Sequence, residues 1–428
     1  MRPAEPLSTD RARRRFQDLP AYIRWPLYAA AAIFVLTVVQ GLDGTDRLTS
    51  ATTAQSMLRW AVPILLAGLG GLYSERSGVV NIGLEGMMVM GTWMGAWGAL
   101  KFGPWWGLLA AIIGGALGGL LHALATVTFG VDHIISGVAI NILAPGMTRF
   151  LSSIVEIPGW SITQSPRIPG VGSATVPVLA GGTIGSWTSP DLLGWLGSRD
   201  WFLISDMADI LKGLLTRASW VTIAALILVP FSAWLLWRTR FGLRVRICGE
   251  YPAAGEAQGI NVYKYKYIAV IISGALAGLG GAFIAGPELS GIYLEGQTQG
   301  RGFVGLAALI FGNWKPGGVL GASLLFGYPF GIGLRDLDGS ASHSLILVSA
   351  IGLALVAISA FRRGRKVDAG LAVGLGALSV LWYLLSESVE SVWINIFPYV
   401  IVLLVLVFFA QRLRVPAADG QIYRRGEA

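Results

Sequence analysis

Long apolar stretches separated by short polar connections recur along the whole chain. They lie at residues 25–42, 57–73, 78–100, 104–129, 132–152, 217–237, 266–287, 302–313, 316–334, 343–361, 367–385 and 393–410. A helix needs about 20 residues to cross a bilayer, and most of these stretches approach or exceed that length. Residues 302–313 are too short to cross alone, so we expect a broken or re-entrant helix there. The pattern predicts an all-α, polytopic transmembrane helical bundle of about 10–12 membrane segments, a count that depends on residues 57–73 and 302–313.

The composition supports a membrane protein over a soluble one. Hydrophobic residues make up 54% of the 428 residues and charged residues 13%, whereas soluble proteins have about 25% charged residues. The mean hydropathy is +0.64, typical of a chain with many membrane spans. The one cysteine, Cys248, excludes a framework of intramolecular disulfides.

The positive charges predict the topology. If the N-terminus lies in the cytoplasm, most of the 32 lysine and arginine residues fall in the inside connections and tails. Positively charged short loops stay on the cytoplasmic side, so both termini are predicted to be cytoplasmic. The predicted regions are a cytoplasmic tail at residues 1–24, a transmembrane domain at 25–411 and a second cytoplasmic tail at 412–428.

The external loop at residues 153–216 contains an amphipathic pattern near its end. Between residues 200 and 217 the charged side chains Asp206, Asp209 and Lys212 lie on one helical face. The opposite face carries only apolar side chains, those of Ile204, Met207, Ile210, Leu211, Leu214 and Leu215. This pattern predicts a helix that lies on the outer membrane surface.

The loop at residues 238–265 is the longest inside connection between two spans. Pro252 suits a first helical turn, Glu250 just before it favours the helix dipole, and Gly259 suits a C-cap. These residues predict a short helix at 252–258. A loop that only joins two spans needs no capped helix, so we interpret this one as a docking surface for a cytoplasmic protein. A solvated, positively charged linker is the alternative.

Glycine spacing predicts close helix packing. Gly-x-x-x-Gly frames are formed by Gly114 with Gly118, Gly115 with Gly119, and Gly274 with Gly278. Such frames let helix backbones approach closely in lipid, either within one chain or between subunits. The pentapeptide AGLGG occurs at residues 67–71 and again at 277–281, in spans predicted to run in opposite directions. An inverted-topology repeat would give this arrangement, and chance recurrence in a glycine-rich chain is the alternative.

Three polar residues inside predicted spans are candidates for the transport pathway: Asn81, Glu85 and Asn141. On a continuous helix Asn81, Glu85 and Met88 would share one face, and Glu85 would lie about 10 Å into the span. A carboxylate is costly there, so it should face the bundle interior, a partner or a wet path. The alternative for Glu85 and Asn141 is a structural hydrogen bond to a backbone or a neighbouring helix.

Sequence signals of catalysis are absent. The dipeptide Gly-Lys of a phosphate-binding loop never occurs, and neither does HExxH or the G-x-S-x-G turn of hydrolases. His122, His133 and His343 are scattered, so no metal cluster is expected. We therefore predict no catalytic residues, no metal and no cofactor.

Several stretches resemble a known family. They are GLYSERSGVVNIGLEGMM (71–88), RTRFGLRVRICGEYPAAGEAQGINV (238–262), GRGFVGLAALIFGNWKPGG (300–318), FPYVIVLLVL (397–406) and PAADGQIYR (416–424). In these stretches the chain resembles the permease subunits of bacterial ATP-binding-cassette importers, in the branch that handles nucleosides and simple sugars.

The resemblance implies a function and partners. The chain would be a multi-pass protein of the bacterial inner membrane that forms the path for a nucleoside or a related small polar solute. ATP would be hydrolysed on separate cytoplasmic subunits. A second permease, a different paralogue, would complete the path, and an extracytoplasmic substrate-binding lipoprotein would deliver the solute. Membrane lipid is the other partner, and nucleic acid is not one.

The resemblance also makes residues 238–262 the coupling segment that contacts the ATPase. Its candidate residues are Arg240, Gly242, Arg244, Arg246, Glu250, Pro252 and Gly259. The segment departs from the family pattern at Tyr251, Gly255 and Gln258, and Gly255 is expected to weaken a short helix by up to about 1 kcal/mol.

Two other classes of function remain as alternatives. An ion-gradient-driven secondary transporter would need a buried ionisable residue, for which Glu85 is the main candidate. A membrane-embedded enzyme has no recognisable nucleophile or metal cluster to support it. The sequence names neither the solute nor the kind of partner permease.

Overall fold

A computed structural model describes residues 21–184, 186–333, 339–386, 388–389, 393, 396, 399–400 and 413–424. The longer helices are α2 (Ala21–Asp43), α3 (Ala51–Arg76), α4 (Leu84–Phe102), α5 (Pro104–Ala123), α6 (His133–Ile154), α9 (Trp220–Arg238), α12 (Val262–Ala285), α14 (Pro316–Gly333), α15 (Ser340–Phe361) and α16 (Lys366–Leu385). The shorter ones are α7 (Leu192–Gly197), α8 (Ile204–Leu215), α10 (Arg240–Glu250), α11 (Pro252–Ala257) and α13 (Arg301–Phe311), and a π-helical turn, Leu124–Thr128, continues α5. The predicted all-α polytopic bundle is confirmed.

Seven helices of the described ranges are long and apolar enough to cross a membrane: α3, α5 with its π-helical turn, α6, α9, α12, α15 and α16. Residues 57–73, one of the two segments that left the count open, belong to the 26-residue helix α3. The apolar pattern underestimated its length because polar residues such as Gln55 and Glu75 lie near its two ends. Residues 302–313 form an 11-residue helix, α13, which is too short to span, as expected.

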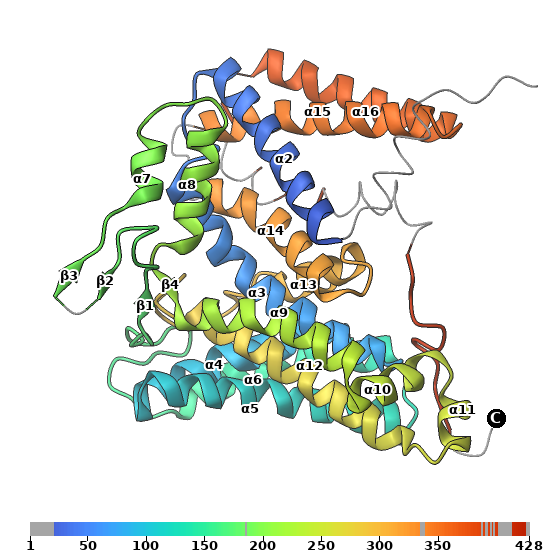
Figure 1. Ribbon diagram of the computed structural model, residues 1–428. Helices are drawn as coiled ribbons and strands as arrows, with labels where there is room; N and C mark the ends of the chain where they lie inside the picture. The colour runs from blue at the N-terminus through green and yellow to red at the C-terminus, as the bar shows by residue number, and fades with distance from the viewer. Residues whose placement is uncertain are drawn as a thin grey trace, which may run out of the picture.

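Two predicted segments have no complete structural test. The N-terminal tail at 1–24 and the last apolar stretch at 393–410 lie largely outside the described residues. Residues 413–424 of the C-terminal tail are described and run beside α10 and α11. Figure 1 shows this segment and α11 at one end of the molecule, with α7 and the strands at the opposite end.

The glycine frames pack helices of the same chain against one another. A Cβ atom on Gly115 would overlap the carbonyl oxygen of Gly274, and one on Gly278 would overlap that of Ala111. A Cβ on Gly118 would lie 2.9 Å from the Met87 side chain. The helices α4, α5 and α12 therefore meet backbone to backbone, and the interpretation of these frames as internal packing is confirmed.

We expect Gly115→Ala to lower the stability of the protein by about 1–3 kcal/mol, because the added methyl group forces α5 away from α12. Thermal unfolding of the detergent-solubilised protein measures this. Gly352→Ala in α15 is the matched control, because a Cβ there meets nothing within 4 Å. An equal loss of stability in both variants would contradict close packing at Gly115.

The two AGLGG segments lie on α3 and α12, which run antiparallel to each other. A Cβ on Gly70 would lie 2.6 Å from the Ser273 carbonyl oxygen, and one on Gly280 would lie 3.1 Å from that of Pro63. The opposite chain directions of the two segments are thus confirmed. A symmetric relation between the two halves of the chain stays a prediction.

The loop at 153–216 folds into short elements. Strand β1 (Ser173–Ala174) pairs with β4 (Ala218–Ser219), and β2 (Thr183–Ile184) pairs with β3 (Trp187–Thr188), both antiparallel. The predicted amphipathic helix is α8, Ile204–Leu215. Its outer-surface location stays a prediction.

The face that α8 buries is not its apolar stripe. The small residues Ser205, Ala208 and Gly213 are buried, and a Cβ on Gly213 would overlap the Ala51 carbonyl oxygen of α3. The apolar side chains of Ile204, Met207 and Leu211 remain exposed on the chain. Because the close approach of α8 to α3 requires small side chains, α8 turns its small residues toward α3. Its apolar face is left outward, available to lipid or to another subunit.

Candidate functional site

The chain breaks its helical course between α3 and α4, at residues 77–83. Gly78 has a φ of +83°, and a Cβ there would lie 3.1 Å from the carbonyl oxygen of Ala418. Ser74 closes the break, since its hydroxyl donates to the Val79 carbonyl at 2.6 Å. Asn81 therefore lies in the break and not on α4, so the expectation that Asn81 and Glu85 share one helical face is wrong. The physical reason is the left-handed backbone at Gly78, which a continuous helix excludes.

Glu85 in the first turn of α4 holds the N-terminus of α13. Its Oε1 accepts from the backbone N–H of Gly300 at 2.8 Å, and its Oε2 accepts from that of Gly302 at 2.6 Å. The first N–H groups of a helix have no partner within it and carry partial positive charge, so a carboxylate is favourable there. A Cβ on Gly302 would lie 2.6 Å from the Glu85 Cα, so the two backbones are in contact.

The two asparagines also hydrogen-bond to neighbouring segments. Asn141 on α6 accepts from the Gly86 N–H at 2.7 Å and donates to the Ile82 carbonyl at 3.0 Å. Asn81 donates to the Ser273 hydroxyl at 2.9 Å, while its buried Oδ1 has no partner. The structure thus brings Asn81, Glu85 and Asn141 to one region around the α3–α4 break. Their contacts match the structural alternative, and their role in a pathway stays a prediction.

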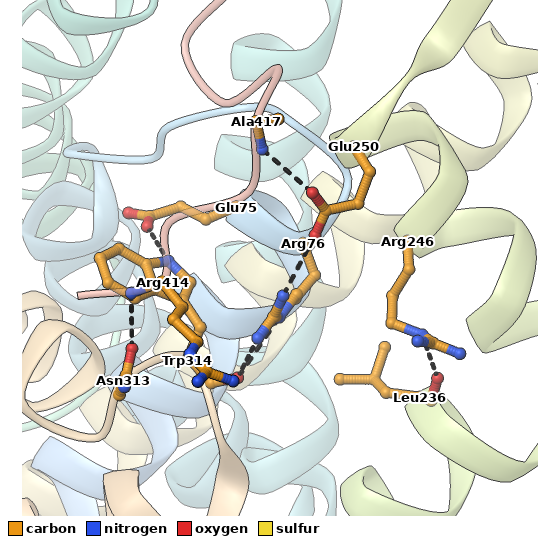
Figure 2. Close-up of polar contacts among 9 residues, drawn as sticks. All are labelled: Glu75, Arg76, Leu236, Arg246, Glu250, Asn313, Trp314, Arg414 and Ala417. Carbon is orange, nitrogen blue, oxygen red and sulfur yellow. Dashed lines mark hydrogen bonds and ion pairs between the residues drawn. The ribbon is translucent and has the colours of Figure 1, made fainter. Parts of the chain in front are cut away.

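A second polar cluster lies at the other end of α13 (Figure 2). The guanidinium of Arg76, the last residue of α3, donates to the Trp314 carbonyl at 2.8 Å and lies 3.6 Å from the carboxylate of Glu250. The indole N–H of Trp314 donates to Glu75 at 2.5 Å. Arg76 therefore connects the end of α10 to the junction between α13 and α14.

Helix α11 begins and ends where the sequence predicts. Pro252 occupies its first turn, and Gly259 follows it with a φ of +76°. The Ile260 N–H donates to the Gly255 carbonyl at 3.0 Å and the Gly259 N–H to the Glu256 carbonyl at 2.8 Å. This pair of bonds is the Schellman ending that a left-handed glycine allows.

The departure from the family pattern at Gly255 has a packing reason. Gly255 is buried, and a Cβ there would lie 2.8 Å from the Ile247 side chain of α10. The glycine lets α11 fold closely onto α10. Glu250, expected to favour the dipole of α11, instead directs its carboxylate to Arg76 and to the Ala417 N–H, which donates to it at 3.2 Å. That expectation is wrong because α10 continues to Glu250 and turns its side chain toward α3.

The remaining candidate coupling residues lie on α10. Arg246 donates to the Leu236 carbonyl at 3.0 Å, and Arg244 donates to the Tyr265 hydroxyl at 2.6 Å. Gly242 is buried where a Cβ would overlap the Leu235 carbonyl oxygen. Arg246 and Arg244 thus attach α10 to α9 and α12, while Arg240 is exposed. Their contact with an ATPase stays a prediction.

The C-terminal segment 413–424 packs against the same cluster. The Ala418 N–H donates to the Gly249 carbonyl at 2.8 Å, and the Arg414 N–H donates to the Asn313 side chain at 2.7 Å. Tyr423 donates to the carboxylate of Glu256 on α11. This segment therefore joins α10, α11 and the α13–α14 junction.

Docking of this segment is expected to depend on pH through Asp419. Burial raises the pKa of its carboxyl from 3.8 to about 7, and the neighbouring charged groups are Glu75 and Arg76 of α3 and Lys266 of α12. A raised carboxyl pKa means that the docked state holds the proton more tightly. Docking is then most favoured below pH 3.8 and weakens as the pH rises toward about 7.

A nitroxide on Gln421→Cys in a Cys248→Ser background measures this docking, because the Gln421 side chain is exposed. We expect the nitroxide to become more mobile between pH 5 and pH 8. The ratio of undocked to docked segments should rise about tenfold or more over this range. Asp419→Asn, which stays neutral, should weaken the change and leave only the part that the neighbouring carboxyl of Glu75 contributes. The same pH response in the asparagine variant would contradict the assignment to Asp419.

A comparison with known proteins covers the same part of the chain. Residues 53–334, which run from the first turn of α3 to the end of α14 and include both ends of α13, match the family described as branched-chain amino acid transport system, permease component. The chain belongs to this permease family. It is a multi-pass membrane permease and not an enzyme.

Relatives of this chain are also named as transporter permeases. The permease is 33% identical over 384 residues to the guanosine ABC transporter permease protein NupQ of Bacillus subtilis, covering 86% of this chain and 95% of the relative. It is 34% identical over 281 residues to the nucleoside ABC transporter permease protein NupC of Lactococcus lactis, covering 64% and 78%. It is 31% identical over 280 residues to the putative glucose ABC transporter permease protein TsgC13 of Haloferax volcanii, covering 64% and 75%. No solved structure matches this chain.

Sequence reasoning missed several residues of this permease that the structure brings to the site. Arg301 lies at the start of α13 and is 5% exposed, and Trp314 and Arg76 lie at its other end. A lone arginine at the start of a short apolar segment was a signal for Arg301. Arg76 and Trp314 are 238 positions apart, and nothing in the sequence pairs them. Within the described residues no group of three or more His, Cys, Asp or Glu side chains could hold a metal.

Proposed function

We propose that this permease forms half of the path of an ATP-binding-cassette importer for a nucleoside. The observation that carries the proposal is a continuous set of contacts from α11 to Glu85. Helix α11 packs on α10, α10 ends in the Glu250–Arg76 ion pair, and Arg76 bonds to Trp314 at one end of α13. Glu85 holds the other end of α13. A displacement of α11 would thus reach the polar break at residues 77–83.

The ATPase subunits would bind at α10 and α11. Arg240 is exposed, α11 ends in a rigid Schellman turn, and the loop carries the positive charge typical of the cytoplasmic side. The residues proposed for this contact are Arg240, Gly242, Arg244, Arg246, Glu250, Pro252 and Gly259. Of these, Gly242, Arg244, Arg246 and Glu250 hold α10 in place, and Pro252 and Gly259 define α11.

The solute class is supported by the names of the relatives. NupQ and NupC carry guanosine and nucleoside in their names. TsgC13 carries glucose, so a simple sugar is the second candidate. The side chains proposed to border the path are Asn81, Glu85 and Asn141, which meet where α4, α6, α12 and α13 come together.

The assembly would need three further kinds of protein. These are the ATPase subunits, an extracytoplasmic binding lipoprotein and a second permease, which is a different paralogue. The exposed apolar side chains of α8 support a contact with lipid or with another subunit. We propose a bacterial cell-membrane location with cytoplasmic tails at residues 1–24 and 412–428, a transmembrane domain at 25–411, an external loop at 153–216 and a coupling loop at 238–265.

Uptake into proteoliposomes tests the proposal. The permease is reconstituted with the ATPase, second permease and binding protein of the proposed importer, and guanosine, uridine and glucose are supplied. We expect ATP-dependent nucleoside uptake that a protonophore leaves intact. Uptake of glucose alone would refute the nucleoside assignment. Uptake that persists without the ATPase and stops with a protonophore would favour the ion-driven alternative.

The contacts of Glu85 argue against that alternative. Both of its oxygens accept backbone N–H groups, so the carboxylate is a fixed helix cap. A coupling carboxylate in a secondary transporter must bind and release an ion in each cycle. If Glu85 released an ion in each cycle, it would also have to release the N-terminus of the short helix α13 in each cycle.

A further inference from the structure

The turn that leads into α13, residues 297–301, contains buried polar atoms without a partner. The Gln297 side chain is 8% exposed, and neither its Oε1 nor its Nε2 is hydrogen-bonded. The Arg301 side chain is 5% exposed, and its Nε has no partner. Buried polar groups in folded proteins are almost always hydrogen-bonded. Three free atoms in one turn therefore mark a place where polar atoms of a solute would be stabilised.

Arg301 is held in a fixed orientation. Its Nη1 donates to the Gln297 carbonyl at 2.8 Å and to the Thr298 carbonyl at 3.0 Å. Its guanidinium lies 4.4 Å from the centre of the Trp60 ring on α3 and 5.4 Å from that of Phe330 on α14. These contacts fix the guanidinium while they leave Nε–H free, so the donor is preorganised.

The turn lies where four parts of the fold meet. Glu85 of α4 bonds to its backbone at Gly300 and Gly302, and α3 and α14 contribute the two rings. Tyr399 donates to the Gln299 carbonyl at 3.1 Å. Because α13 links this turn to the cluster around Arg76, the turn would move when α10 and α11 move.

The chemistry of the free atoms selects a class of solute. A carboxamide offers one acceptor and one donor side by side, and the Arg301 Nε–H adds a second donor. This set complements a nucleobase edge on which an acceptor stands next to a donor. Such an edge is the carbonyl and N–H of hypoxanthine or, with the carboxamide turned over, the ring nitrogen and amino group of adenine. The carboxylate of Glu85 disfavours an anionic solute, and the guanidinium of Arg301 disfavours a cationic one.

We propose that Gln297 and Arg301 contact the base of a nucleoside as it passes through the permease, along an uncharged edge that places an acceptor beside a donor. The inference rests on the proposed nucleoside function and adds the part of the nucleoside that is recognised. The sugar would face elsewhere, since the free atoms match the base edge.

The test compares inosine, which has this edge, with purine riboside, whose base has no substituent at this edge and therefore no donor beside the ring nitrogen. Uptake by the complete reconstituted transporter is measured at saturating, loaded binding protein, so that differences in delivery do not contribute. We expect Gln297→Met, which removes both polar atoms, to lower the inosine-to-purine-riboside uptake ratio about fivefold or more. Arg301→Lys, which keeps the charge and removes Nε–H, should lower it in the same direction.

Gln55→Met is the matched control, because its amide on α3 donates to the Thr216 carbonyl, which is outside this turn. ATPase co-purification establishes that each variant assembles. An equal fall in inosine and purine riboside uptake, or an unchanged ratio in assembled variants, would overturn the inference. A wild-type transporter that moves neither nucleoside would instead refute the proposed function, before any variant is compared.

Discussion

Glu85→Gln is expected to reduce solute uptake at least tenfold, although the side chain keeps its shape. Each carboxylate oxygen of Glu85 accepts one N–H from the start of α13. A glutamine supplies one acceptor and one NH₂ group, so one backbone N–H would face another donor. Hydrogen bonds to charged groups contribute about 1.5–3 kcal/mol, and 1.4 kcal/mol is tenfold in population. The short helix α13 would therefore separate from α4 in a large fraction of molecules.

Uptake, membrane abundance and ATPase stimulation by loaded binding protein are measured together. We expect the variant to reach the membrane, to bind ATPase and to hydrolyse ATP with weak coupling to transport. Asn141→Asp is a useful comparison, because it keeps the acceptor for the Gly86 N–H and replaces the donor to Ile82. Normal transport by Glu85→Gln would mean that the cap on α13 has no part in the transport cycle.

The sequence predicted this region in part. The apolar pattern placed the spans, marked residues 302–313 as a broken helix and identified Asn81, Glu85 and Asn141 as unusual. It could not reveal their partners, because Glu85 bonds to residues 215 and 217 positions away. It also placed Asn81 on a helix, since the left-handed conformation of Gly78 depends on the packing of Ala418 and Cys248 around it.

Local signals were the most reliable at the coupling loop. Pro252 and Gly259 define α11 through their own backbone preferences, so their positions could be predicted without knowledge of the fold. The carboxylate of Glu250 could not be assigned in this way, because Arg76 lies in a different helix. The same limit explains why the docking of residues 413–424 was not foreseen.

The second large effect is expected for Gly259→Val in this loop. Gly259 has a φ of +76°, and a left-handed backbone costs an L-residue roughly 1–2 kcal/mol, with β-branched residues affected most. The valine would favour loss of the bonds from the Gly259 and Ile260 N–H groups that end α11. No span is altered, so the protein should still insert. We expect about a tenfold loss of ATPase co-purification, or retained ATPase without stimulation by loaded binding protein.

Gly259→Asn separates backbone strain from side-chain size. A Cβ at this position meets nothing within 4 Å, so neither variant creates a steric clash with the rest of the chain. Asparagine tolerates the left-handed conformation, and valine does not. The asparagine variant should therefore keep most ATPase binding and uptake while the valine variant loses them. If the valine variant binds ATPase and takes up solute like the wild type, the loop is only a linker between α9 and α12. The contacts that lead from α11 to Glu85 would then not transmit the motion of the ATPase to the transport path.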